Sequence, residues 1–95
     1  MNDPLNSMRK KLHWRAWHRG TKELDHLMGQ FVDLHLAKMT EEQMLAVADF
    51  MQEPEPELTV WLTDSSTVPE YLPAFLKDWL RSYEFDPIYQ KKPSS

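Results

Sequence analysis

The sequence predicts an all-α fold, a compact bundle of about five helices. Apolar residues recur three and four positions apart in several stretches, as on one face of a helix, and no stretch alternates convincingly as a strand would. Helix-start signals and prolines separate these stretches. The chain has 95 residues and a hydrophobic fraction of 41%, which suffices for one domain with a core. We expect that domain over residues 1–84, followed by an extended tail over residues 85–95.

Three helices are expected in the first half of the chain. Asp3 can cap the first helix, with Pro4 at its first position, and Gly20 ends it. The second helix ends near Lys38, whose charge suits the negative end of a helix dipole. The third begins with Thr-Glu-Glu-Gln from Thr40, a capping box. The apolar positions of the three helices are Leu5, Met8, Leu12 and Ala16, then Leu24, Leu27, Met28, Phe31, Leu34 and Met39, then Met44, Leu45, Ala48 and Met51.

Prolines set the last two helices apart from the first three. Pro54 and Pro56 stand two positions apart, which a helix interior does not tolerate, so Pro56 is expected to begin a short fourth helix. A polar loop over residues 63–67 follows, and Pro69 opens a fifth helix. The inward positions are Leu58, Trp61 and Leu62 in the fourth helix, and Tyr71, Leu72, Phe75, Leu76, Trp79, Leu80 and Tyr83 in the fifth.

Charge is segregated along the chain. The net charge is −4, yet residues 9–22 hold six bases and no acid, while residues 23–70 hold eleven acids and one base. Such a dipolar molecule suits an oriented docking event. Ordinary solvated helix faces, with no binding role, explain the pattern equally well.

Composition also limits the cellular compartments in which the protein is expected. The chain has no cysteine, which excludes disulfides and thiolate metal sites. Its start lacks the apolar region of a signal peptide, and no run of about 18 apolar residues could span a membrane. We expect a cytoplasmic protein.

Catalytic and metal sites have little support in the sequence. The histidines at positions 13, 18, 26 and 35 include no pair four residues apart, the spacing that helical zinc sites use. The carboxylates at positions 53, 55 and 57 flank prolines in a turn, where nothing apolar would tune them for acid–base catalysis. No glycine-rich phosphate loop is present. We therefore expect neither an enzyme nor a metal site.

The basic first helix leaves other classes open. A small nucleic-acid-binding or toxin-neutralising regulator would also use such a helix, in which Trp14 and Trp17 stand beside Lys10, Lys11 and Arg15. The negative net charge of the chain argues against nucleic acid. A membrane-surface helix has a similar composition, but the apolar stripe of this helix is needed for the core. An interaction module with an unrelated partner is a further alternative.

The stretch His-Arg-Gly-Thr-Lys-Glu, which begins at His18, joins the first two helices. Gly20 is expected to cap the second helix, which leaves Glu23 at its third position, where its carboxylate can accept the Gly20 N–H. Such a corner needs no further purpose. However, Trp14 and Trp17 lie one turn apart and His18 lies one turn beyond Trp14, and exposed aromatics beside arginine are typical of a binding hot spot.

These motifs resemble a known family, the succinate dehydrogenase flavinylation factors (SdhE-type assembly factors), whose hallmark is Arg-Gly-x-x-Glu at the joint of the first two helices. The resemblance covers residues 9 to about 63, and the fifth helix agrees only in type. It is carried by Lys11-Leu12-His13-Trp14, by His18-Arg19-Gly20-Thr21-Lys22-Glu23-Leu24-Asp25, by Phe31, by Met39-Thr40-Glu41-Glu42, and by Pro56-Glu57-Leu58 with Trp61-Leu62.

The resemblance implies a five-helix bundle that binds the flavoprotein subunit of succinate dehydrogenase, and often that of fumarate reductase, and promotes covalent attachment of FAD to it. Such a factor is an assembly chaperone without catalysis of its own, and it holds no cofactor permanently. No nucleic acid or membrane insertion is expected, and the protein is expected to be a monomer.

The family's functional residues carry over onto the corner between the first two helices. His18 stands where members usually have another arginine, and Trp17 and the tail have no clear counterpart. The resemblance implies a partner-binding site made of Arg19, Gly20 and Glu23, followed by Trp14 and Asp25, with Arg15 and His18 beside them.

Overall fold

The computed structural model describes residues 3–88, and within them all regular secondary structure is helical. The predicted all-α bundle is confirmed. The helices follow one another as α1 (Pro4–Trp17), α2 (Lys22–His35), the 3₁₀ helix η1 (Leu36–Lys38), α3 (Glu41–Phe50), α4 (Glu55–Thr63), the 3₁₀ helix η2 (Ser65–Thr67) and α5 (Ala74–Ser82).

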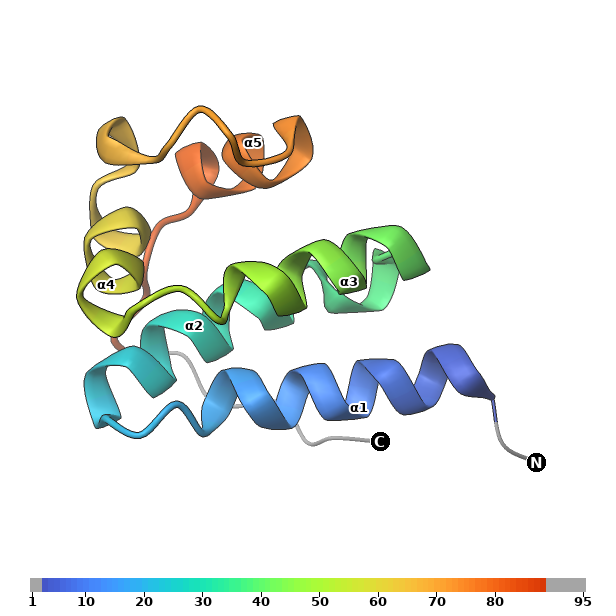
Figure 1. Ribbon diagram of the computed structural model, residues 1–95. Coiled ribbons are helices and arrows are strands. Elements are labelled where there is room, and N and C mark those ends of the chain that lie inside the picture. The colour runs from blue at the N-terminus through green and yellow to red at the C-terminus, as the bar shows by residue number, and fades with distance from the viewer. Residues whose placement is uncertain (1–2, 89–95) are drawn as a thin grey trace.

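The first two helices form the base of the bundle. α1 and α2 run antiparallel, side by side, and the short corner over residues 18–21 joins them (Figure 1). α3 also contacts α1, and α4 contacts α2. α5 lies on the far side of α2 and α3 from α1, so the corner and α5 occupy different parts of the molecule (Figure 1).

One apolar core joins these helices. Full burial of a leucine, phenylalanine or methionine side chain contributes about 1.5–3 kcal/mol, so this cluster is the main source of stability. Its members are Leu12, Ala16, Leu24, Leu27, Met28, Phe31, Val32, Met39, Met44, Val47, Phe50, Met51, Leu58, Trp61, Leu62, Leu72, Leu76 and Leu80.

The predicted helix starts of α1 and α3 are confirmed. The Leu5 N–H donates to Asp3 Oδ1 at 3.0 Å. At α3, the Gln43 N–H donates to Thr40 Oγ1 at 3.1 Å, and the Thr40 N–H donates to Gln43 Oε1 at 3.0 Å, which completes the capping box. These side chains satisfy N–H groups that have no partner inside the helix.

The predicted start of the fifth helix is wrong. α5 begins at Ala74 and not at Pro69, because Pro73 cannot donate a backbone hydrogen bond and disfavours helical geometry at the residue before it. Pro69 opens only a turn, in which the Leu72 N–H donates to the Pro69 carbonyl at 3.4 Å. Tyr71, expected to face inward, is therefore 69% exposed.

Two other predicted core positions are also exposed. Leu34 on α2 and Leu45 on α3 fit the apolar spacing of their helices but lie at the surface. Helical spacing gives the face on which a residue lies, whereas burial needs a neighbour on that face. No other helix of the described chain covers these two positions well enough to bury them.

The segment after α5 packs along α2. The Tyr83 hydroxyl donates to the Leu27 carbonyl at 2.8 Å. The Gln30 amide pairs with both backbone groups of Asp86: Gln30 Nε2 donates to the Asp86 carbonyl at 2.9 Å, and the Asp86 N–H donates to Gln30 Oε1 at 2.7 Å. Much of the tail expected over residues 85–95 lies outside the described residues, and the domain boundary at 84/85 stays a prediction.

Within residues 3–88, no helix is both long enough and apolar enough to cross a bilayer.

Candidate functional site

The corner between α1 and α2 depends on one glycine. Gly20 has φ of +121°, a backbone conformation that other L-residues rarely adopt. Thr21 follows in extended geometry and caps α2, because its Oγ1 accepts the Leu24 N–H at 3.3 Å. The expectation that Gly20 itself caps α2 is wrong by one residue: the Thr21 hydroxyl accepts a hydrogen bond from the helix, whereas glycine has no side-chain acceptor.

Asp25, and not Glu23, satisfies the backbone of this corner. Asp25 Oδ1 accepts the N–H of Arg19 and also the N–H of Gly20, the latter at 3.2 Å. The predicted bond from Gly20 to Glu23 is therefore absent. With Thr21 as the cap, Glu23 moves to the second helical position, and the carboxylate four residues after the cap reaches back instead. Glu23 is exposed and makes no hydrogen bond or ion pair within the described chain.

The Arg19 side chain makes no hydrogen bond or ion pair within residues 3–88. Arg19 is half-buried, and its Nε atom is buried without a hydrogen-bond partner in the part of the chain that the structure describes. A buried donor with no acceptor costs about 1–3 kcal/mol. Glu55, in the first turn of α4, lies close by: a β-carbon placed on Gly20 would be 3.7 Å from Glu55 Oε1. The start of α4 thus flanks the corner.

Trp14 is the exposed aromatic of the site. It is 60% exposed on α1, and the ring of His18 stacks on it with centroids 4.3 Å apart and planes 13° apart. The predicted one-turn relationship between the two residues is confirmed. His18 Nδ1 lies 2.7 Å from the Trp14 carbonyl, which can only accept, so Nδ1 carries the hydrogen. The stack holds a large apolar surface beside the exposed Arg15.

Trp17 has a different role from Trp14, although the sequence placed both in one hot spot. Trp17 is 7% exposed, and its indole lies directly on Gly29 of α2, where a β-carbon would overlap the ring. Its Nε1–H donates to the buried Asp33 Oδ2 at 3.2 Å, and Asp33 Oδ1 lies 2.8 Å from His13 Nδ1 in a second hydrogen bond. These contacts fasten the end of α1 to α2 and so hold the corner in place.

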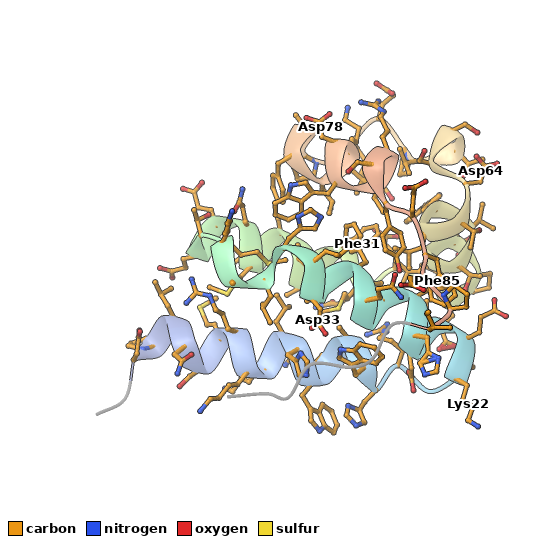
Figure 2. The ribbon with its side chains drawn as sticks, turned by 180° about the vertical axis from the view of Figure 1, so that it is seen from behind. Lys22, Phe31, Asp33, Asp64, Asp78 and Phe85 are labelled. Carbon is orange, nitrogen blue, oxygen red and sulfur yellow. The ribbon has the colours of Figure 1, made fainter. Side chains whose placement is uncertain are left out.

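The predicted site residues therefore lie in three adjacent parts of the structure. These are the last turn of α1 with its stacked aromatic pair, the corner, and the first turns of α2, where Lys22 also lies (Figure 2). Of the six bases between residues 9 and 22, Arg9 is used inside the fold, since its guanidinium donates to the carbonyls of Leu36 and Met39. The other five form a basic face on α1, the corner and the first residue of α2.

No group of three histidine or carboxylate side chains within residues 3–88 is placed to hold a metal ion. The features that gather at this site are an exposed aromatic, bases and a half-buried arginine around a helix corner. This combination of a small helical bundle and an exposed, aromatic and charged corner is typical of a protein-binding module.

The comparison with family models identifies the module. The model for the family described as "Flavinator of succinate dehydrogenase" matches residues 10–82, and the chain belongs to this family. The sequence-based resemblance is thereby confirmed, and the matched region extends through α5, beyond the end of the predicted resemblance.

Curated relatives agree with this assignment. The chain is 41% identical over 68 residues to the protein named FAD assembly factor SdhE of Acetobacter pasteurianus, over 72% of this chain and 62% of the relative. It is 35% identical over 66 residues to the mitochondrial succinate dehydrogenase assembly factor 2 of Dictyostelium discoideum, over 70% of this chain and 47% of that protein. The matched region thus spans about half to three-fifths of these relatives. No solved structure matches the chain.

Proposed function

We propose that the protein is an assembly factor that binds the flavoprotein subunit of succinate dehydrogenase and promotes covalent attachment of FAD to that subunit. Membership of the flavinator family supports this function, as do the names of the relatives. The observation that carries this function is that different residues of the corner serve the fold and remain free of it. Asp25 and Thr21 satisfy the backbone, so the side chains of Arg19 and Glu23 are left without a structural task.

The role proposed for the corner is recognition. Gly20 carries no side chain, so a partner's backbone can approach the turn closely. Arg19 offers a planar set of donors suited to a carboxylate or a carbonyl, and its unpaired Nε–H has most to gain from an acceptor on the partner. Trp14, stacked on His18, supplies apolar area at low entropic cost, since the stack already limits its rotamers.

The factor would act by shifting a conformational equilibrium and not by chemistry of its own. Covalent attachment requires the flavin and a side chain of the flavoprotein in near-attack geometry. A binder that prefers this arrangement raises its population by its differential affinity for it. The FAD in this scheme belongs to the flavoprotein, and the factor holds no cofactor of its own. The flavoprotein subunit of fumarate reductase is proposed as a second partner.

A reconstituted attachment assay tests the function. Apo-flavoprotein is mixed with FAD and the factor, and covalent flavin is measured by fluorescence on a denaturing gel. The Arg19→Ala variant should be no less stable than the unaltered protein, to within about 0.5 kcal/mol, because the side chain makes no hydrogen bond or ion pair within residues 3–88. It should bind the flavoprotein more weakly by about 2 kcal/mol or more, as expected for a hot-spot arginine.

Arg81→Ala is the control for loss of an arginine, because it removes the same type of side chain from an exposed position on α5, away from the corner. It should retain binding and flavin attachment. Folded Arg19→Ala and Glu23→Ala proteins with full activity would contradict the proposal. A flavoprotein that gains covalent FAD equally well with and without the factor would contradict it too.

Association with the flavoprotein should also depend on salt. The basic face of α1 and the corner favour encounter with an acidic surface, and ions screen this attraction over a Debye length of about 10 Å at 0.1 M salt. An association rate that does not change from low to high ionic strength would remove charge from the recognition mechanism.

A further inference from the structure

A second surface, separate from the corner, lies between α3 and the segment that leads into α5. Asp49, Phe50 and Glu53 line it from the end of α3, and Tyr71 and Leu72 line it from the opposite side. The groove encloses about 260 Å³. None of its lining residues belongs to α1, the corner or α2.

The groove has an apolar floor and an acidic rim. Phe50 and Leu72, which belong to the core, are buried, whereas Asp49 is exposed and Glu53 is half-buried. Tyr71 stands at the opening, 69% exposed, and its hydroxyl donates to Glu53 Oε2 at 3.3 Å. The late start of α5 creates this surface, because a helix from residue 69 would have turned these side chains differently.

The acidic charge of the rim is not neutralised by the fold. Asp49, Glu53 and Glu57 have no ion-pair partner within residues 3–88, and no lysine or arginine lines the groove. Lys77 on α5 pairs with Glu70 at 3.8 Å instead. The pKa of Tyr71 is raised, first by desolvation of its hydroxyl and then by the neighbouring carboxylates of Glu53 and Glu57. These unpaired carboxylates at the rim would stabilise a cation in the groove.

The size of the groove points to a single side chain. Small-molecule and cofactor pockets enclose about 300–1,000 Å³, so 260 Å³ in an open groove is too little for a nucleotide or a flavin. An arginine or lysine has an apolar stem that can lie on a floor such as Phe50 and Leu72 and a cationic head that can reach carboxylates at the rim. An exposed tyrosine ring beside the head adds a cation–π contact.

We propose that this groove is a second protein-docking site, which accepts an arginine or lysine side chain, flanked by aliphatic residues, from an extended segment of a partner protein. The site has the opposite charge preference to the basic face of α1. The molecule would therefore present two docking surfaces of opposite sign on different parts of the bundle. This proposal does not depend on the function assigned to the corner.

Binding of short peptides to the ¹⁵N-labelled full chain tests the proposal. The probes are acetyl-Gly-Leu-X-Leu-Gly-amide peptides in which X is arginine, lysine, glutamine or glutamate. The arginine and lysine peptides should shift the amide resonances of Asp49, Glu53 and Tyr71. They should bind up to about fivefold more tightly than the glutamine peptide, the largest ratio expected when one exposed ion pair is formed. The glutamate peptide should not bind at these residues.

Variants with matched charge changes locate the site. Glu53→Gln and Tyr71→Ala should each weaken the arginine peptide about threefold to fivefold, whereas Glu42→Gln, which removes an exposed acid from the start of α3, outside the groove, should not. Arg19→Ala should leave peptide binding unchanged, which separates this site from the corner. Equal affinity for the arginine and glutamine peptides would overturn the proposal. Shifts confined to residues outside the groove, or affinity that Glu53→Gln and Tyr71→Ala leave unchanged, would overturn it as well.

Discussion

The indole of Trp17 on α1 lies on the backbone of Gly29, at a position where α2 carries no side chain. Gly29 is the residue that makes room for the ring. This pairing explains a glycine in the interior of a helix, where glycine alone is about 1 kcal/mol less favourable than alanine.

The same pairing predicts that the effect of Gly29→Ala on stability reverses when Trp17 is removed. Gly29→Ala should lower the free energy of unfolding by about 1–3 kcal/mol, because the new methyl group overlaps the indole. In a Trp17→Ala background the same change should raise stability by up to about 1 kcal/mol, since only helix propensity remains. Urea unfolding of the four proteins in this double-mutant cycle measures the coupling. Equal effects of Gly29→Ala in both backgrounds would contradict the packing described.

The corner gives a second prediction, which separates Asp25 from Glu23. Asp25→Ala removes the acceptor of two backbone N–H groups and should lower stability by about 0.5–2 kcal/mol, as loss of a helix cap does. Glu23→Ala should change stability by less than about 0.5 kcal/mol, because Glu23 has no partner within the described chain. Thermal unfolding of both variants checks this ranking. The reverse order would mean that Glu23 holds the corner.

A third prediction concerns the segment after α5. Gln30→Ala removes both hydrogen bonds to the backbone of Asp86, at about 0.5–1.5 kcal/mol each, and should loosen the segment around Asp86 from α2, while Tyr83 keeps its bond to the Leu27 carbonyl. Hydrogen exchange of the Asp86 amide should become faster. Asp86→Ala is the control, because it keeps the backbone groups that pair with Gln30 and should retain slow exchange. Fast exchange at this amide in the unaltered protein would contradict the prediction.

A fourth prediction concerns pH and His35. Burial lowers the pKa of His35 below its ordinary value of 6.5, and its ring stacks on Trp79 with centroids 4.1 Å apart. The unfolded chain thus binds the proton more readily, so this histidine's contribution is complete above pH 6.5 and falls as the pH drops through the window just below it. His35→Phe keeps an aromatic ring against Trp79 but cannot titrate.

The measurement for His35 is a comparison of two pH profiles. The difference in unfolding free energy between the unaltered protein and His35→Phe should remain constant above pH 7. It should change in favour of the variant between about pH 6.5 and pH 5, as the unfolded histidine takes up its proton. Parallel profiles over this range would show that His35 titrates normally in the folded state.

The sequence by itself determined the all-α class and the starts of α1 and α3. Hydrophobic spacing and the capping signals at Asp3 and Thr40 act within a few residues, so they do not depend on the rest of the fold. The Arg-Gly-x-x-Glu stretch at the joint was also sufficient to indicate the family, and Gly20 does have the positive φ that a tight corner requires. Two further local signals set helix starts: Pro73 sets the start of α5, and Thr21 caps α2.

Only the tertiary structure decided which side chains serve the fold and which remain at the surface. Trp14 and Trp17 lie one turn apart on α1, but only Trp17 packs against Gly29 of α2 and is buried. Asp25, and not Glu23, accepts the corner's hydrogen bonds because the backbone around Gly20 directs the N–H groups of Arg19 and Gly20 toward Asp25. Burial and hydrogen bonding across a corner depend on what approaches from elsewhere in the chain, and helical periodicity carries no information about that approach.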